Sequence, residues 1–452
     1  MRVSLRALIG RPESWLVLAF AALIIAGTTL LALPPAHADA DVGLLDSFFT
    51  AASAVCVTGL TTVDTATAWS RFGQVVILAL IQLGGLGIMT FGAVAAYLLH
   101  LRLSFAGQAA WKTALFEGQG RGDLRRALYG ILLVTFALET GGAWLLFQEL
   151  QASPTPRGGA FEAVFLAVSA FCNAGFSVYS DNVAGFSDSP LILGTLMVLV
   201  VAGGLGYTVL LEIGRRLWCR IRHRPPPSVR WSLHTRVVLT FGGVLIVAGA
   251  VLLLIFGCHR PHDVWSARAT HALFHSVSAR TAGFNTVDIG ALPVGALLIL
   301  IALMFIGGAP GSCAGGIKIT TAAVWLARVV ARLASREDVT LAGRKLPQDV
   351  VRRAALVVSV AMLWNLLGIL VLTVSEGAGV RVRFEHVIFE QVSAFGTVGL
   401  SAGLTPALSP LGKLWIVATM FVGRLGPLTI ALAVLSPPRV THGYPTERVM
   451  IG

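Results

Sequence analysis

Residues 53–60 read Ser53-Ala54-Val55-Cys56-Val57-Thr58-Gly59-Leu60, and related stretches occur three more times in this 452-residue chain. They are Ser169-Ala170-Phe171-Cys172-Asn173-Ala174-Gly175-Phe176, Ser278-Ala279-Arg280-Thr281-Ala282-Gly283-Phe284 and Ser393-Ala394-Phe395-Gly396-Thr397-Val398-Gly399-Leu400. Each stretch begins with Ser-Ala and ends with a glycine followed by Leu or Phe. The four glycines are 116, 108 and 116 residues apart. Such a near-constant period indicates four copies of one structural unit.

A second glycine-rich mark follows each of these stretches. The marks are Gly84-Gly85-Leu86-Gly87, Gly203-Gly204-Leu205-Gly206, Gly307-Gly308 and Gly423-Arg424-Leu425-Gly426, and they begin 25, 28, 24 and 24 residues after the preceding loop glycine. Two interpretations remain open for these clusters. They serve either close packing between helices or a functional site halfway along each unit.

Apolar runs define the rest of the unit. The chain is 56% hydrophobic and only 12% charged, whereas soluble domains average about 25% charged residues, so lipid is its expected solvent. Eight apolar runs predict spanning helices: Trp15–Leu33, Gln74–Leu99, Ala127–Leu146, Leu191–Ile213, Val237–Phe256, Val294–Ile306, Ala354–Val374 and Leu414–Ala433. For the sixth, a continuation through Val330 after a glycine-rich break stays open. Four runs of about a dozen residues are too short to span and predict re-entrant helices: Leu44–Cys56, Ala160–Cys172, Ala267–Arg280 and Phe384–Gly396.

These patterns together predict the fold class. We expect an all-α polytopic membrane protein built from four helix–pore-helix–filter-loop–helix repeats around a pseudo-fourfold pore. The repeats are expected at residues 1–107, 108–224, 225–345 and 346–440, with a C-terminal tail at 441–452. The first apolar run also resembles a signal peptide, because it ends in Ala36-His37-Ala38. However, its length and its place in the first repeat favour a spanning helix.

The distribution of basic residues predicts the orientation. The formal net charge is +12, and 24 of the 34 Lys and Arg residues fall at the two ends and in the stretches 102–126, 215–236 and 328–353. By the positive-inside rule these regions face the cytoplasm, so both termini are expected to be cytoplasmic in a multi-pass protein of the cell (inner) membrane. The basic residues form no patch interleaved with aromatic residues, which argues against nucleic-acid binding.

The four glycine loops predict an ion path. Backbone that is not helical at membrane depth needs protein or water around it, and carbonyl oxygens arranged in rings can replace the hydration shell of a cation. The loops contain no carboxylate of the kind that calcium and magnesium prefer, so potassium is the expected ion. The predicted filter positions are Val57, Thr58, Gly59, Asn173, Ala174, Gly175, Thr281, Ala282, Gly283, Thr397, Val398 and Gly399.

Other classes of function are weaker matches to the sequence. Secondary carriers tend to have two inverted repeats, whereas each unit here contains two full spans and returns to the same side. No HExxH or GxSxG motif and no paired carboxylates on adjacent spans point to an enzyme. The five cysteines have no CxxC spacing, so we interpret them as structural thiols.

The chain resembles the Trk/Ktr/HKT superfamily of potassium transporters over essentially its whole length. The loop glycines, the stretch Ser278–Thr286, the segment Gly307–Lys318 and Gly423-Arg424-Leu425-Gly426-Pro427-Leu428-Thr429 carry this resemblance, and Tyr444-Pro445-Thr446-Glu447-Arg448-Val449 looks most like the tail of a Ktr-type membrane subunit (KtrB). The resemblance implies a selectivity filter at the four glycines and a homodimer with one pore in each subunit. It also implies gating by a cytoplasmic nucleotide-binding ring of the RCK type (KtrA/TrkA-like), which binds the nucleotide in place of this chain. Sodium dependence is common among Ktr members and stays open here.

A glycine-rich interruption of the sixth apolar run predicts a gate. Residues 307–316 contain five glycines and one proline, a composition that no helix tolerates. The family resemblance assigns the segment 307–317 as an intramembrane gating loop. The gating residues are expected to be Gly307, Gly308, Gly311, Gly315, Gly316, Lys318 and Arg424. A P-loop is not supported, because the lysine does not directly follow the glycine.

Ionisable residues inside apolar runs are functional candidates by default. We expect Arg424 to line the pore as an electrostatic barrier, with Glu139 or helix-end carbonyls as alternative partners. Lys318 either takes part in the gate or extends toward the cytoplasm. Glu212 lies near Arg215 and Arg216, so an ion pair is its simplest interpretation, and Glu139 has no assigned role.

Overall fold

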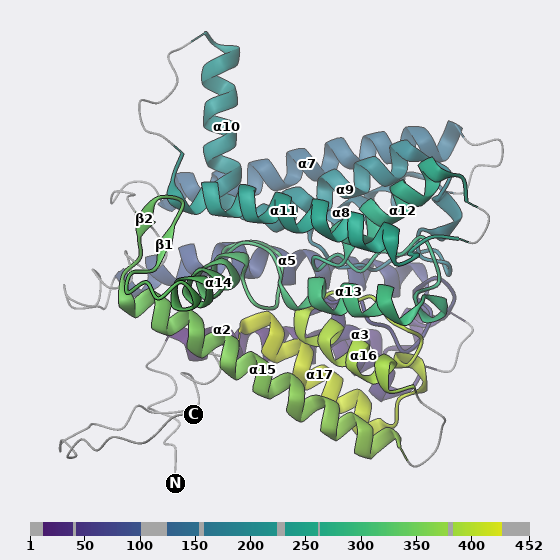
Figure 1. Ribbon diagram of the computed structural model, residues 1–452. Helices are drawn as coiled ribbons and strands as arrows, with labels where there is room; N and C mark the ends of the chain where they lie inside the picture. Colours follow the sequence, from purple (N-terminus) through teal and green to yellow (C-terminus); the bar gives the residue numbers. More distant parts are fainter. Residues whose placement is uncertain are drawn as a thin grey trace.

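The computed structural model describes residues 12–38, 42–100, 124–152, 158–223, 231–260, 263–377 and 383–426. Most of them are helical, and the helices lie side by side in a bundle (Figure 1). The predicted tail 441–452, most of the basic stretch 102–126 and residues 427–433 of the last predicted span lie outside the described residues.

Helices occupy the predicted apolar runs, and one more follows the glycine-rich interruption at 307–316. They are α2 (Pro12–Leu31), α5 (Arg71–His100), α7 (Leu124–Ala152), α9 (Pro190–Leu205), α10 (Tyr207–Ile221), α11 (Leu233–Ile255), α13 (Val294–Phe305), α14 (Ile319–Leu333), α15 (Gln348–Glu376) and α17 (Pro410–Leu425). Within the described residues, α7, α11 and α15 are each long and apolar enough to cross a membrane alone, and the pair α9–α10 could make a fourth span.

The predicted span Leu191–Ile213 is wrong as a straight helix. The chain bends by 110° between α9 and α10, and Gly206 at the bend has a φ of +80°, which glycine adopts without a steric penalty. The apolar run continues across this bend, so hydropathy alone could not reveal it. Helix α10 therefore projects away from the bundle (Figure 1).

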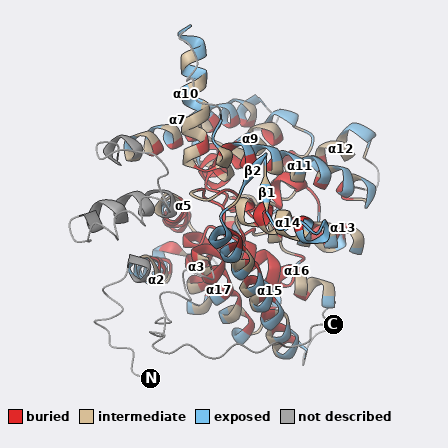
Figure 2. Cartoon of the chain, turned by 60° about the vertical axis from the view of Figure 1, so that its left-hand side comes forward, coloured by how far each residue is buried: buried red, intermediate tan, exposed pale blue. Residues whose placement is uncertain are grey.

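Four short helices lie where the re-entrant segments were predicted. They are α3 (Leu44–Val55), α8 (Ala160–Phe171), α12 (Trp265–Ser278) and α16 (Phe384–Gly396). Each packs against the long helix that precedes it: α2 on α3, α7 on α8, α11 on α12, and α15 on α16. Each also receives a long helix from another unit: α5 packs on α8, α9 on α12, α13 on α16, and α17 on α3. The second set of contacts forms a closed cycle, and buried residues fill the centre of the bundle (Figure 2).

The second glycine marks lie where long helices cross the ends of short ones. A Cβ atom added to Gly84, Gly203 or Gly423 would collide with a backbone carbonyl oxygen. The oxygens belong to Val55, Phe171 and Phe395 respectively, at the C-terminal ends of α3, α8 and α16. The packing interpretation of these glycines is therefore confirmed in three units, and in the third the corresponding cluster opens an irregular loop.

Outward-facing helices expose large apolar side chains. On α11, Val244 and Val247 are more than 60% exposed, and Leu363 on α15 is 66% exposed. Such surfaces are unfavourable in water and suit the hydrocarbon region of a membrane.

The smaller elements connect these helices. They are the short helix α4 (Thr65–Ala68) and the 3-10 turns η1 (Pro34–Ala36), η2 (Ala184–Phe186), η3 (Ile289–Ala291) and η4 (Thr405–Ala407). The strands β1 (Thr340–Leu341) and β2 (Arg344–Lys345) form an antiparallel hairpin, so the expectation of an all-α chain is wrong at this point. Ala342 and Gly343 both have positive φ, as a two-residue hairpin turn requires.

Candidate functional site

The four loops that follow the short helices share one backbone conformation. In each loop the first residue and the glycine two positions later have positive φ: Val57 and Gly59, Asn173 and Gly175, Thr281 and Gly283, and Thr397 and Gly399. Positive φ is rare for a β-branched residue, and such strain persists only where the surroundings enforce it. The sequence predicted the glycines but contained no signal for the strained residue before them.

The loop glycines lie against one another's loops in a circle. A Cβ atom added to Gly175 would lie 2.7 Å from the carbonyl oxygen of Ala282. The other three glycines would meet the corresponding carbonyl still more closely: Gly59 that of Ala174, Gly283 that of Val398, and Gly399 that of Thr58. The loops therefore follow one another from the first to the fourth and back to the first. All twelve predicted filter residues come together in this circle.

Each loop is tied to its own short helix by the serine of the Ser-Ala motif. The Ser169 hydroxyl donates to the carbonyl oxygen of Phe176 at 2.7 Å, and Ser278 donates to Phe284 at 2.5 Å. Ser393 donates to Leu400 and also accepts from the N–H of Gly399 at 3.2 Å. In the first unit, Ser53 accepts from the N–H of Gly59 at 3.1 Å. In the sequence these serines mark the repeat, and their recurrence in all four units is the signal for this role.

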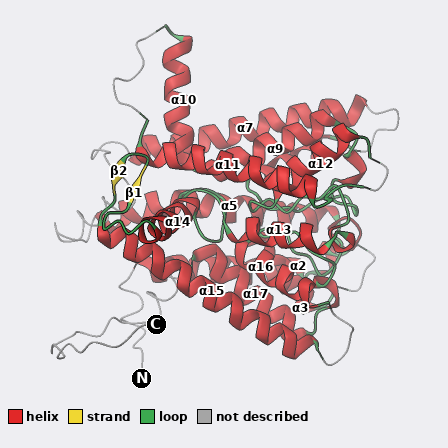
Figure 3. Cartoon of the chain, viewed as in Figure 1, coloured by secondary structure: helices red, strands yellow, loops and turns green. Residues whose placement is uncertain are grey.

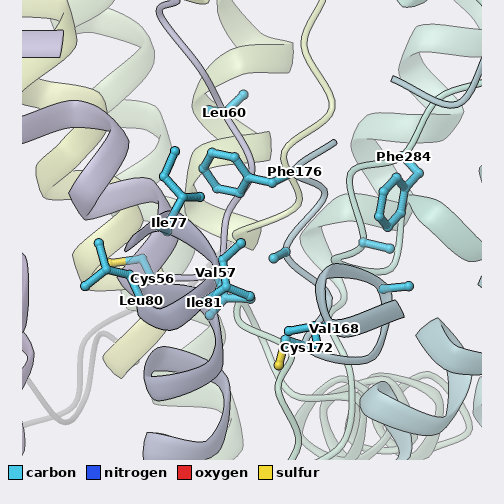
Figure 4. Close-up of a cluster of buried hydrophobic side chains, with 14 of the residues drawn as sticks. Cys56, Val57, Leu60, Ile77, Leu80, Ile81, Val168, Cys172, Phe176 and Phe284 are labelled. Atoms are coloured by element: carbon cyan, nitrogen blue, oxygen red, sulfur yellow. The ribbon is translucent and has the colours of Figure 1, made fainter. Parts of the chain in front are cut away.

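The apolar residue after each glycine anchors the outer end of its loop. Leu60, Phe176, Phe284 and Leu400 are at most 1% exposed. Figure 4 shows the first three among buried side chains that include Ile77 and Ile81 of α5. The serine hydrogen bonds and the apolar burial thus both fix the loop at the glycine and the residue that follows it.

The segment between α13 and α14, predicted as an intramembrane loop and called so below, is irregular, and irregular segments run through the centre of the bundle (Figure 3). Backbone N–H groups of this loop donate to carbonyl oxygens of the second glycine marks. The bonds run from Ala309 to Gly204 at 2.9 Å, from Cys313 to Gly203 at 3.2 Å, and from Gly316 to Gly423 at 3.2 Å. The loop is therefore held by the second and fourth units.

The intramembrane loop also lies directly against the predicted filter loops. A Cβ atom added to Gly315 would collide with the side chain of Thr397, and one added to Gly316 would lie 3.2 Å from the Cα atom of Gly396. Side chains at these positions would separate the two loops. The glycines that were predicted to allow gating thus permit close contact in this conformation.

Arg424 binds the intramembrane loop through backbone carbonyls. Its guanidinium donates to the carbonyl oxygen of Cys313 and, at 2.8 Å, to that of Gly84 in the first unit, and the side chain is 2% exposed. Glu139 is not its partner, and the two carbonyls lie inside α5 and in the loop instead of at helix ends, so neither alternative partner applies. Lys318 folds back onto the same loop and donates to the carbonyl oxygen of Ala314 at 2.5 Å.

The two intramembrane acids have separate surroundings. Glu139 is 5% exposed and accepts from Gln82 at 3.2 Å, and its other oxygen lies 3.9 Å from the Cys172 thiol. Glu212 accepts from Arg216 at 3.4 Å, which agrees with the expected ion pair, and also from Thr235 at 2.6 Å.

Two ion pairs lie where short helices begin. Arg71 at the start of α5 donates to Glu162 in the first turn of α8, and Lys413 in α17 pairs with Asp46 in the first turn of α3 at 2.8 Å. Burial opposes ionisation of the Glu162 carboxyl, but hydrogen bonds from Arg71 and from the N–H of Gly159 hold its pKa below the ordinary value. Each pair joins neighbouring units of the cycle.

A bundle of apolar helices that contains a circle of carboxylate-free loops, with a glycine-rich segment against them, defines a multi-pass membrane protein that transports cations. The chain matches the family described as "TrkH: Cation transport protein" over residues 13–439, and it belongs to that family. It is therefore a cation transporter and not an enzyme, as predicted.

Individual relatives support the same assignment. The chain is 37% identical over 446 residues to the Ktr system potassium uptake protein B of Vibrio alginolyticus, with 97% of this chain and 94% of the relative covered. It is 33% identical to the potassium/sodium uptake protein NtpJ of Enterococcus hirae, with 98% and 97% covered. The crystal structure of the potassium transporter TrkH from Vibrio parahaemolyticus matches the fold with a TM-score of 0.74 at 21% identity, covering 96% of this chain and 86% of that one. The expected resemblance to the Trk/Ktr/HKT superfamily is confirmed.

Proposed function

We propose that this chain takes up potassium ions across the cell membrane through a channel-like path in which the four loops form the selectivity filter. The observation that carries the proposal is the closed circle of positive-φ glycines, each against a carbonyl of the next loop. The helix contacts that link the fourth unit back to the first support a pseudo-fourfold arrangement of the repeats 1–107, 108–224, 225–345 and 346–440.

Potassium is the ion that this chemistry favours. The predicted ligands are backbone carbonyls of the twelve filter residues, with the ion held at Gly59, Gly175, Gly283 and Gly399, and carbonyl rings suit a cation that loses its water readily. The C-terminal ends of α3, α8, α12 and α16 precede the loops, and helix C-termini carry a partial negative charge. The names of the relatives from Vibrio and Enterococcus include potassium uptake, and the second also includes sodium.

The intramembrane loop is the proposed gate. Gly307, Gly308, Gly311, Gly315 and Gly316 let the segment lie beneath the filter, and Arg424 and Lys318 bind its carbonyls. The positive charge of Arg424 beneath a cation filter would repel an incoming ion. Opening would therefore require the loop to leave Arg424 and the glycine carbonyls that hold it.

The remaining parts of the proposal concern partners and placement. The relative from Vibrio alginolyticus is named as one protein of a Ktr system, which supports a regulatory partner. We infer a homodimer with one pore in each subunit and a cytoplasmic RCK-type ring that binds the nucleotide. Both termini would face the cytoplasm from the inner membrane.

A flux assay tests this function. Purified protein in liposomes should carry potassium and rubidium faster than sodium and lithium, and repeating the assay with added sodium decides whether sodium stimulates the flux. The variant Gly283→Asp should lose the preference for potassium, because its φ of +78° and the nearby carbonyl of Val398 leave no room for a side chain. Equal transport of all four ions by wild-type protein, or normal potassium preference in Gly283→Asp, would contradict the proposed filter.

A further inference from the structure

Glu390 is a carboxylate buried behind the fourth filter loop. It lies in α16 three residues before Ser393 and is 0% exposed. Its oxygens accept hydrogen bonds from the hydroxyls of Ser401 at 2.5 Å and Thr405 at 2.7 Å, and from the N–H groups of Ala402 at 3.1 Å and Leu404 at 3.2 Å. A buried carboxylate is tolerated when donors satisfy it in this way.

All four donors lie in the segment that leaves the fourth loop. Gly399 and Leu400 end the loop, and residues 401–405 follow directly. Ser393 binds the N–H of Gly399 and the carbonyl of Leu400, while Glu390 binds four of the next five residues. The fourth loop is therefore held by two side chains on one face of α16, since positions three apart are neighbours on a helix.

The equivalent position differs in the other units. It is Thr50 in α3, Leu166 in α8 and His275 in α12. His275 Nε2 accepts from the N–H of Thr286 at 3.4 Å, and Thr286 follows Gly283 by three residues, as Ala402 follows Gly399. Leucine cannot accept a hydrogen bond, and within the described residues the Thr50 hydroxyl has no partner. The fourth unit thus has the most extensive attachment at this position.

The fourth loop is also the one that closes the circle. Gly399 lies against the carbonyl of Thr58 in the first loop, so a shift of the outer end of loop four would displace a contact between the first and last units. Because carbonyl cages discriminate between ions through their dimensions and dipoles, such a shift would change which ion the filter prefers.

We propose that Glu390 is a positioning residue for ion selectivity: it holds residues 401–405 so that the Gly399 loop keeps its place against the first loop. This role rests on the proposed function of the loops as a filter. Glu390 acts through the backbone that it fixes and does not bind the ion.

The test compares Glu390→Gln with Glu385→Gln in the same helix. Glutamine keeps the size of the side chain, but its amide NH2 group would face the hydroxyl and N–H donors of residues 401–405 and could not accept hydrogen bonds from them. Glu385 lies in the first turn of α16 and is only partly buried, so the same substitution there controls for a general effect on the helix. We expect the potassium-to-sodium flux ratio in liposomes to fall about tenfold in Glu390→Gln, the loss typical of a bond to a charged group, and to stay at the wild-type value in Glu385→Gln.

Separate outcomes distinguish this inference from the proposed function. Wild-type protein that carries no potassium would count against the proposed function and would be seen before any variant is compared. If Glu390→Gln folds and its potassium-to-sodium flux ratio equals that of the wild type, the positioning role is overturned. A residue with only a structural role would lower the melting temperature without changing this ratio.

A second pair of variants keeps the test decisive if Glu390→Gln fails to fold. Thr405→Val and Ser401→Ala each remove one donor and leave the carboxylate in place. Each should lower the flux ratio several-fold, and combining them should lower it by less than the product of the single effects, as expected for groups that share one partner. Wild-type ratios in both single variants would equally overturn the inference.

Discussion

The predicted filter loops and the predicted intramembrane loop are both irregular backbone inside the bundle, but their attachments differ. Each filter loop is bound by a serine from the short helix directly before it. The intramembrane loop is bound by carbonyls of Gly203, Gly204 and Gly423 and by Arg424, all from other units. The serine bonds thus attach each predicted filter loop locally, whereas the intramembrane loop has, besides bonds from Arg280 and Lys318 of its own unit, bonds that reach two other units.

If the intramembrane loop is the gate proposed above, this difference would let one protein combine a rigid part with a movable part. A filter loop moves together with its short helix, so a displacement between units leaves its serine bond intact. The same displacement breaks the bonds of the intramembrane loop, because their two ends lie in different units. Gating by relative motion of the units would therefore release the loop while each filter loop keeps its own serine bond.

The largest expected effect is that of changing Gly399, in the fourth predicted filter loop, to alanine. Gly399 and Gly403 have φ values of +91° and +88°, but a Cβ atom on Gly399 would collide with the carbonyl of Thr58, whereas nothing lies within 4 Å of one on Gly403. Backbone strain and overpacking together cost about 3 kcal/mol. We expect Gly399→Ala to lower potassium flux by a factor on the order of 100. Gly403→Ala, which adds the same strain without the collision, should keep most of the flux.

The next largest effect concerns the bonds that Arg424 makes to the intramembrane loop and to the first unit. Arg424→Met removes both bonds and the charge at similar volume, and bonds to a charged group contribute about 1.5–3 kcal/mol each. Potassium flux through the protein without its cytoplasmic partner should rise about tenfold or more. Lys413→Met, which removes a cation at the outer ion pair with Asp46, serves as the control. Unchanged flux at normal protein levels would remove Arg424 from the gate.

Serine variants separate local attachment from ordinary packing. Ser278 binds the loop carbonyl of Phe284, whereas Ser276 on the same helix donates at 2.7 Å to Ile246 of α11. Losing either bond should cost about 1 kcal/mol of stability. Only Ser278→Ala should also lower the potassium-to-sodium flux ratio, by a few-fold. Equal ratios in the two variants would show that the serine bonds do not set filter geometry.

The smallest expected effect lies at the outer contact between neighbouring units. Glu162→Gln should lower stability in detergent at pH 7 by less than about 1 kcal/mol, because Arg71 is 60% exposed. The pKa of Glu162 is depressed in the folded protein, so its contribution is complete above the unfolded pKa of about 4.3. This contribution to stability is lost as the pH falls through the lower pKa of Glu162 in the folded protein. Melting curves of wild type and variant should therefore converge in acid, and a gap that widens in acid would contradict the assignment.

The repeated elements could be predicted from sequence because each is local. The Ser-Ala and glycine spacing located the four loops, and the short helices begin and end within about two residues of the predicted bounds. Composition located the interruption after Phe305, since five glycines and a proline cannot form a helix.

The features that could not be predicted from sequence depend on residues that are distant along the chain. The positive φ of Val57 and Thr397 is imposed by surrounding loops, because valine and threonine have no preference for it. Arg424 could be recognised as unusual, but its carbonyl partner in Gly84 lies 340 residues away. The role of Glu390 also depends on the path of residues 401–405, since an acid in an apolar helix has no partner until the chain is folded.

The contact between α17 and α3 has a consequence for how the protein is made. Asp46 and Lys413 are separated by 367 residues, so α3 leaves the ribosome long before the helix that completes its surroundings. During synthesis the first filter loop lacks Gly399 on one side, and the neighbouring space must be filled by lipid, water or a chaperone. The newly inserted first unit is therefore expected to be the most vulnerable to membrane proteases until the fourth unit arrives.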